Sequence, residues 1–176
     1  MLTNEESNHT VSSIFYKKGS ILQSPGDEKK VGYLVLKGLL RSYTIDIKGK
    51  EHNFMFAPEN WIISDLEATE FNQPSVLYIQ CLEDSWVIKM DVHDFLGNNP
   101  TKNSPAERAK LLARRVAVLQ RRVLMLMSAP ARERYEHFVE TYPQLIHRIS
   151  QKNIASYLGI TPEALSKIRR EIVKVK

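Results

Sequence analysis

Short stretches rich in β-branched and aromatic residues fill the first half of the chain. They predict six strands, at residues 14–17, 31–36, 39–45, 51–56, 76–82 and 86–90. Turn-forming residues separate these stretches, among them Gly19, Gly38 and Gly49. Strands that recur roughly every ten residues, with no long helical pattern between them, predict an all-β sandwich or barrel.

The pattern becomes helical after residue 100. Ser104, Pro105 and Glu107 supply an N-cap, a first-turn proline and the acidic partner of a capping box, so a helix is predicted to begin here. Apolar residues then recur at spacings of three and four along one seam. The seam residues are Ala109, Leu112, Val116, Leu119, Val123 and Leu126. The helix is expected to span about 24 residues, or roughly 36 Å, before Pro130 ends or kinks it.

This seam has two interpretations. It can pack against the β domain of its own chain, or it can pair with the same helix of a second chain. A helix of this length extends beyond what one small β domain can cover, which favours pairing. We therefore expect a homodimer, the commonest symmetric assembly, with the six seam residues as its dimerisation contacts.

The C-terminal part predicts shorter helices. Residues 130–142 form an amphipathic segment, and the stretch 150–170 follows it. Within that stretch, Gly159 supplies a left-handed residue after a helix of about two turns, and Thr161 and Pro162 begin the next helix. A short helix, a turn containing glycine and a second helix are typical of a helix-turn-helix, although a plain pair of helices has the same pattern.

Charge divides the chain into two halves. Residues 1–99 carry 9 Lys and Arg against 14 Asp and Glu, whereas residues 100–176 carry 16 against 6. This asymmetry indicates a polyanionic partner for the basic half alone, unless the basic helices only meet solvent. Duplex DNA is favoured over a membrane surface, because the apolar face of residues 104–127 is a narrow seam. It is favoured over single-stranded RNA because the basic half lacks an aromatic-bearing strand motif.

The predicted DNA contacts lie in and before the second helix of the helix-turn-helix. In a DNA complex the first residues of such a helix reach base edges in the major groove, and flanking basic groups reach phosphates. Leu165 and Ile168 form the inward stripe of this helix. The candidate DNA-binding residues are Gln151, Thr161, Glu163, Ser166, Lys167, Arg169 and Arg170.

Several other classes of protein are excluded by what the sequence lacks. No apolar run is long enough to cross a bilayer and the N-terminus is no secretory signal, so a cytoplasmic protein is expected. The single Cys81 allows neither an intrachain disulfide nor a four-cysteine cluster. The five histidines are scattered, unlike the ligands of a cupin-type metal enzyme, and the isolated glycines form no phosphate loop. We expect no enzyme activity, no cofactor and no metal site.

The sequence also resembles a known family. Residues 133–135, 142–145 and 154–169 closely resemble the Crp/Fnr family of bacterial transcription regulators, most of all its Bacteroidetes-type members. Residues 37–43 and 49–51 resemble strands of the cyclic-nucleotide-binding β-roll of that family. The resemblance implies an α+β chain with a β-roll or jelly-roll sensor, a long central dimerisation helix and a C-terminal winged helix-turn-helix.

Three parts follow from this resemblance. They are a β-roll effector-sensing domain (1–103), a dimerisation helix (104–128) and a helix-turn-helix DNA-binding domain (129–176). Because few residues follow the second helix of the helix-turn-helix, little or no wing is expected. The implied function is that of a dimeric regulator that binds double-stranded DNA in a sequence-specific way and responds to an unknown small-molecule effector, if it has one.

The sequence departs from the family members that bind cyclic AMP. Those members carry a Gly-Glu pair and, further on, an Arg-Ser or Arg-Thr pair whose arginine holds the cyclic phosphate. Here no Gly-Glu pair is present and Pro74, which has neither charge nor N–H, stands in place of the arginine. Weak or no cyclic AMP binding is therefore expected, with a regulator responsive to a cyclic nucleotide as the alternative. Candidate residues for another effector are Trp61, Ser75, Val76 and Tyr78, although Trp61 and Tyr78 could equally be core aromatics.

The second helix of the helix-turn-helix departs as well. Pro162 stands where the cyclic AMP receptor has an arginine, whereas Glu163 is retained and could accept a hydrogen bond from a cytosine amino group. Lys167 replaces a later base-reading arginine. The operator is therefore expected to differ from that of the receptor.

Overall fold

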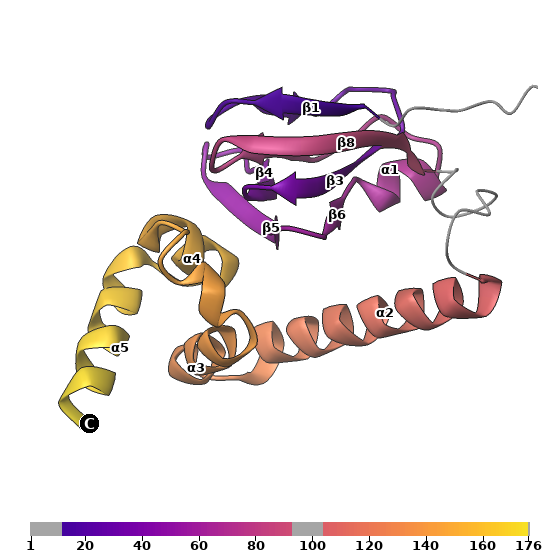
Figure 1. Cartoon of the computed structure of the whole chain (residues 1–176). Coiled ribbons are helices and arrows are strands. Elements are labelled where there is room, and N and C mark those ends of the chain that lie inside the picture. The colour runs from indigo at the N-terminus through magenta and orange to yellow at the C-terminus, as the bar shows by residue number, and fades with distance from the viewer. Residues whose placement is uncertain (1–11, 93–103, 176) are drawn as a thin grey trace, which may run out of the picture.

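The N-terminal part of the chain folds into two four-stranded antiparallel sheets (Figure 1). The computed structural model describes residues 12–92 and 104–175. One sheet has the strand order β1 (Ser13–Tyr16), β8 (Ser85–Asp91), β3 (Val31–Lys37), β6 (Ile62–Ile63). The other has the order β2 (Ile21–Gln23), β7 (Tyr78–Cys81), β4 (Leu40–Ile45), β5 (Glu51–Ala57). Together they form the β-roll.

The core of the β-roll lies between the two sheets. Val35 and Val87 from one sheet pack with Leu40 and Ile79 from the other, and all four are fully buried. Neighbouring side chains along a strand point to opposite faces, so each sheet contributes one face to this core. Cys81 belongs to the same core, and burial raises the pKa of its thiol.

The β4–β5 hairpin closes in a tight turn at Gly49, one of the predicted turn-forming residues. Gly49 has a φ of +77°, a conformation that favours glycine. Asp46 Oδ1 accepts hydrogen bonds from the backbone N–H groups of Lys48 and Lys50 at 2.9 and 3.0 Å. The hydrogen bond to His52 and the backbone bonds lower the pKa of Asp46 to about 2.

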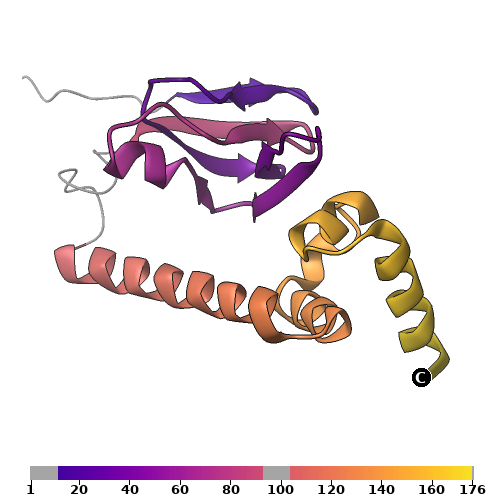
Figure 2. The ribbon, with the colours of Figure 1, turned by 180° about the vertical axis from the view of Figure 1, so that it is seen from behind.

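A long helix runs along one side of the β-roll (Figures 1 and 2). Helix α2 (Pro105–Ser128) has the predicted length, and Ser104 and Glu107 form the predicted capping box. It ends at Ala129, and helix α3 (Ala131–Thr141) begins directly after Pro130.

The remaining helices form the helix-turn-helix. Ser150 caps helix α4 (Gln151–Tyr157), because its hydroxyl accepts a hydrogen bond from the backbone N–H of Asn153 at 3.3 Å. Gly159 has a φ of +66° in the turn, and helix α5 (Pro162–Val175) follows. A 3₁₀ turn, η2 (Pro143–Leu145), connects α3 to this pair.

Four short elements were not predicted from the sequence, and one predicted domain boundary lies outside the described residues. The missed elements are β2, β6, the five-residue helix α1 (Leu66–Glu70) and the 3₁₀ turn η2. The predicted boundary at residue 103 lies in an undescribed range. The expectation about a wing also stays a prediction, because α5 itself occupies the described residues up to Val175.

Candidate functional site

One face of α5 gathers most of the predicted DNA-binding residues. Glu163, Ser166, Lys167 and Arg170 follow each other at spacings of three and four and so share one side of the helix. The opposite side carries Leu165 and Ile168, which are buried in the core of the helix-turn-helix. We call the first four residues the recognition face.

Two neighbours extend the recognition face. The Ser166 hydroxyl donates a hydrogen bond to Gln151 Oε1 on α4 at 3.4 Å. Thr161 caps α5, because its hydroxyl oxygen accepts the backbone N–H of Ala164 at 3.2 Å. Backbone hydrogen bonding and the Thr161 hydroxyl lower the pKa of Glu163, which keeps this carboxylate ionised.

Arg169 lies apart from the recognition face. At 100° per residue it is turned roughly 120° away from it, beside the buried stripe, and it is only partly exposed. It can reach a flanking phosphate but not the same base edges as Lys167.

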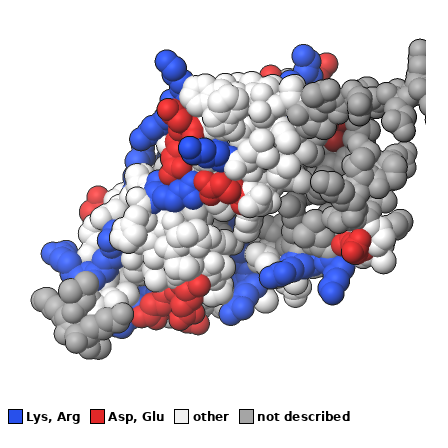
Figure 3. Space-filling view, viewed as in Figure 1, with Lys and Arg blue, Asp and Glu red and all other residues white. Residues whose placement is uncertain are grey.

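In Figure 3, Lys and Arg side chains gather along α2 and toward the end of α5, whereas the upper face of the β-roll is largely uncharged.

The predicted dimerisation seam of α2 is not covered by the β-roll of its own chain. Val116 and Val123 are 63% and 53% exposed, and Leu112, Leu119 and Leu126 are more than a third exposed. Ala109 is exposed too. An apolar stripe of this length is rarely left in water by a monomeric protein.

Asp65 is buried beside two of the predicted effector-binding residues, Ser75 and Val76. Its Oδ2 accepts hydrogen bonds from the Ser75 hydroxyl at 2.9 Å and from the backbone N–H groups of Val76 and Leu77 at 3.0 and 3.2 Å. Its Oδ1 accepts the backbone N–H of Ala68 and so caps α1 at 3.1 Å. Asp65 is only 4% exposed. A carboxylate of the chain itself therefore satisfies these donors.

The four predicted effector-binding residues lie in different surroundings. Ser75 is buried and Val76 is exposed beside Asp65. The Tyr78 ring stacks on Tyr43 with 4.9 Å between centroids. The Trp61 ring meets the edge of Tyr142, beyond the end of α3, at 6.3 Å, so it contributes to the contact with the C-terminal helices.

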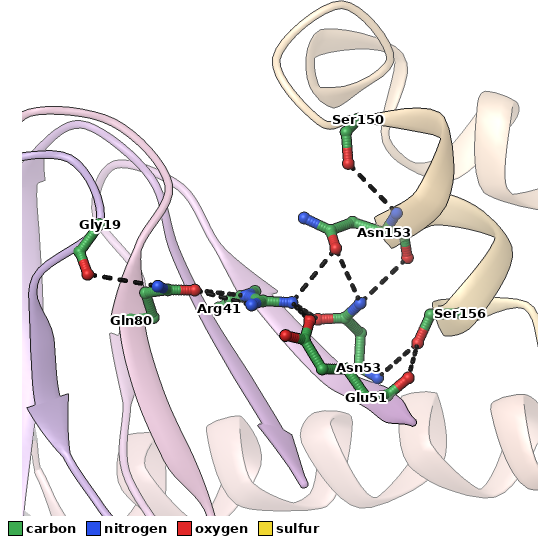
Figure 4. A network of polar contacts seen from close by, with 8 residues as sticks. All are labelled: Gly19, Arg41, Glu51, Asn53, Gln80, Ser150, Asn153 and Ser156. Atoms are coloured by element: carbon green, nitrogen blue, oxygen red, sulfur yellow. Dashed lines mark hydrogen bonds and ion pairs between the residues drawn. The ribbon is translucent and has the colours of Figure 1, made fainter. Parts of the chain in front are cut away.

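A polar network joins the β-roll to α4 (Figure 4). Arg41 on β4 is 5% exposed and donates to Glu51 at 2.7 Å and to Asn153 Oδ1 on α4 at 3.1 Å. The backbone N–H of Asn53 on β5 donates to the Ser156 hydroxyl at 2.9 Å, and that hydroxyl donates to the backbone carbonyl of Glu51 at 2.8 Å. The first helix of the helix-turn-helix is thereby fixed to the edge of a sheet.

A second polar cluster lies on the segment before α4. The Arg148 guanidinium donates five hydrogen bonds, to both carboxylate oxygens of Glu59, both of Glu83 and the carbonyl of Gly38, at 2.7–3.0 Å. The hydrogen bonds from Arg148 lower the pKa of Glu59 to about 2. Both acidic residues belong to the β-roll, so this cluster also crosses between the two parts.

Apolar contacts run across the same boundary. Leu39 and Phe56 come from the β-roll, yet they are buried in one cluster with Phe138, Leu158 and Leu165 of the C-terminal helices. Sequence reasoning assigned none of these bridging residues to a site. Arg41, Asn53 and Arg148 are single polar residues far apart in the chain, and only the fold brings them together.

Metal-binding and membrane-spanning features are absent from the described part of the chain. In residues 12–92 and 104–175 no group of three or more His, Cys, Asp or Glu side chains is placed to hold a metal ion. Within the same ranges no helix combines the length and the apolar character needed to cross a bilayer.

A β-roll, a long adjoining helix and a helix-turn-helix follow one another along the chain. The chain is 27% identical over 169 residues to the fumarate and nitrate reduction regulatory protein of Yersinia pestis, covering 86% of this chain and 65% of that protein. No family model matches the chain. In sequence and in fold the chain is therefore similar to transcription regulators of the Crp/Fnr family.

Solved structures show the same fold. A mutant of CooA from Carboxydothermus hydrogenoformans matches with a TM-score of 0.72 and 22% identity, covering 93% of this chain and 77% of that one. A CRP/FNR family transcriptional regulator from Thermus thermophilus matches with a TM-score of 0.67 and 18% identity, covering 93% and 86%. The chain spans about two thirds of the length of the Yersinia relative, and its assignment to the Bacteroidetes-type members stays a prediction.

Proposed function

We propose that the protein is a homodimeric transcription regulator that binds duplex DNA sequence-specifically through the recognition face of α5. The observation that carries the proposal is this face itself, where Glu163, Ser166, Lys167 and Arg170 lie opposite a buried apolar stripe. A helix of this kind enters the major groove with its first residues at base edges. Acting on DNA would place the protein in the cytoplasm.

The exposed seam supports the dimer in this proposal. Two copies joined along α2 would present their recognition faces to successive major grooves when the two α5 helices lie about 34 Å apart. The polar network and the Arg148 cluster fix the helix-turn-helix to the β-roll, so any change in the β-roll would alter the separation and tilt of the two faces. An effector could shift that equilibrium only by binding the two arrangements with different affinities.

Selection of duplexes from a random DNA library tests this function. We expect an enriched inverted repeat whose half-sites lie about one helical turn apart. The selection should be carried out near physiological salt, because non-specific binding fades steeply as salt rises. Binding without any enriched sequence would contradict sequence-specific recognition.

Lys167→Ala should weaken binding to the selected operator by roughly 1–3 kcal/mol if Lys167 contacts a base. The reason is that a good contact to a base edge accounts for about this much discrimination. Fluorescence anisotropy on the operator and on a scrambled duplex measures the effect. An equal loss of affinity for both duplexes would make Lys167 a phosphate contact instead. No loss of affinity for either duplex would mean that Lys167 does not contact the DNA.

Cyclic AMP and cyclic GMP should give no saturable heat in calorimetric titrations of the full chain. Asp65 already accepts the hydroxyl and backbone N–H groups of residues 75–77. A cyclic phosphate at the same donors would have to displace this carboxylate, and Pro74 offers it no positive charge in exchange. Tight binding of either nucleotide would favour the alternative, a regulator responsive to cyclic nucleotides.

A further inference from the structure

A cavity of about 150 Å³ lies where the central helix meets the helix-turn-helix. Its walls come from α2, α3 and α4, and they include Met125, Phe138 and Tyr157. None of the predicted effector residues lines it. A cavity of comparable volume is known to hold a single benzene ring, so a ligand here would be about as large as one ring.

Basic side chains line this cavity and no acidic side chain does so among the described residues. Arg121, Arg122, Arg134 and His137 are all part of the wall. In the described ranges no Asp or Glu oxygen lies within ion-pair distance of these three arginines, although Arg41, Arg132 and Arg148 elsewhere in the chain each have such a partner. The cavity thus combines apolar walls with unneutralised positive charge.

Arg122 has polar and aromatic partners, but none of them among the described residues is acidic. Its guanidinium lies 4.0 Å from the centroid of the Tyr157 ring and donates to the backbone carbonyls of Asn53, Phe54 and Tyr157. Its Nε is buried without a hydrogen-bond partner, and burial lowers the pKa of the group. A buried cation without a counter-ion is costly, and the dipoles of carbonyl groups offset only part of that cost.

Arg134 on α3 also lines the cavity, and its guanidinium is in a similar environment to that of Arg122. Its Nη1 donates to the carbonyl of Leu158 at 2.7 Å, while its Nε is buried without a partner. Arg121 is exposed at the rim, where a ligand can reach it from solvent. An anion bound among these groups would supply the missing negative charge.

The cavity remains separate from the predicted dimer seam. Val118, Arg122 and Met125 face it from a side of α2 that is turned roughly 120° from the seam at 100° per residue. Leu126 alone belongs to both surfaces. Pairing of two α2 helices along the seam would therefore leave this side of the helix uncovered.

We propose that this cavity binds a small carboxylate with an apolar body, such as a one-ring or short-chain organic acid. The carboxylate would pair with Arg121, Arg122 and Arg134, and the apolar body would contact Met125 and Phe138. Such a ligand would touch the central helix and the helix-turn-helix together. Its binding would hence favour one placement of α4 and α5 relative to α2. This regulatory step rests on the proposed DNA-binding function, whereas the binding itself does not.

Calorimetric titration of the full chain with benzoate, hexanoate and the neutral analogue benzamide tests the proposal. We expect saturable binding of at least one acid in the micromolar to millimolar range, as suits a ligand of so few atoms. Benzamide should bind at least about tenfold more weakly than benzoate, because it lacks the charge that the arginines pair with. No saturable binding of either acid up to about 20 mM, or equal binding of benzoate and benzamide, would overturn the proposal.

Two matched variants locate the binding site. Arg121→Gln removes an exposed cation of the rim and should weaken binding of the acid severalfold without affecting folding. Arg132→Gln removes an exposed cation of α3 that is already paired with Glu136 and does not line the cavity, so it should leave binding unchanged. Unaltered binding in Arg121→Gln and in Arg122→Gln, with both variants folded by circular dichroism, would place the acid elsewhere.

DNA binding with and without the acid separates the two hypotheses. If the acid binds but no operator can be selected under any condition, the proposed DNA-binding function is wrong and ligand binding in the cavity is supported. If an operator is bound and neither acid gives saturable heat, ligand binding in the cavity is wrong and the DNA-binding function is supported. If both bind, the acid should change the affinity for the operator, and an unchanged affinity would overturn the regulatory step.

Discussion

Val116→Glu should convert the proposed dimer into a monomer. In a two-fold dimer paired along α2, the substituted positions of the two chains would lie near one another, so two carboxylates would be desolvated together. Burial of an unpaired charge costs several kcal/mol per ion, so the dimer should dissociate at least about a hundredfold more readily. Sedimentation velocity over a range of concentrations measures the change.

Ala117→Glu is the matched control for this variant. Ala117 neighbours Val116 and is likewise exposed, but it lies roughly 100° round the helix, away from the seam. The same added charge should therefore leave dimerisation nearly unchanged. If both variants stay dimeric, or if the unmodified protein sediments as a monomer, the dimer contact does not lie along this seam. A monomeric Val116→Glu variant should also lose its preference for inverted repeats.

Arg148→Ala should destabilise the junction between the β-roll and the helix-turn-helix by about 2–4 kcal/mol. The variant loses five charge-assisted hydrogen bonds and leaves Glu59 and Glu83 near each other without a cation. Partial exposure of all three side chains keeps the loss below the full value for a buried network. Urea unfolding monitored by circular dichroism measures it, and hydrogen exchange in α4 should accelerate.

The same cluster should make the junction sensitive to acid. Arg148 lowers the pKa of Glu59 from its ordinary 4.5 to about 2. A carboxylate whose pKa is lower in the folded state stabilises that state fully above its ordinary pKa. Its contribution is lost as the pH falls from about 5 toward 2. Arg148→Ala should flatten this part of the pH–stability curve, while Arg132→Ala on the exposed surface should not. An unchanged curve in Arg148→Ala would mean that other groups cause the acid sensitivity.

The sequence was sufficient for the elements whose patterns are local. The capping box at Ser104, the seam of α2, Gly159 in the turn and the two helices of the helix-turn-helix all follow from the spacing of nearby residues. The six predicted strands all exist, with ends shifted by a few residues. The two-residue β6 and the five-residue α1 were missed because they are too short to show a period.

The residues that connect the parts could not be predicted, because they depend on contacts between distant segments. Arg41 and Asn153 are 112 positions apart, and each looks like an ordinary surface residue in the sequence. Arg122 lies off the predicted seam of the long helix, and only the fold shows that its side chain turns toward β5 and α4. Asp65 directly precedes α1 and could have been recognised as its N-cap, but its role as acceptor for residues 75–77 requires the fold.

The burial of Leu39 and Phe56 within the core of the C-terminal helices has a consequence for evolution and for engineering. Part of the core of the helix-turn-helix is contributed by these two residues of the β-roll. Substitutions on the two sides of this contact should therefore be inherited in compatible pairs. A chimera that joins this β-roll to the DNA-binding part of another regulator should fold well only if the residues that meet Leu39 and Phe56 are carried over with it.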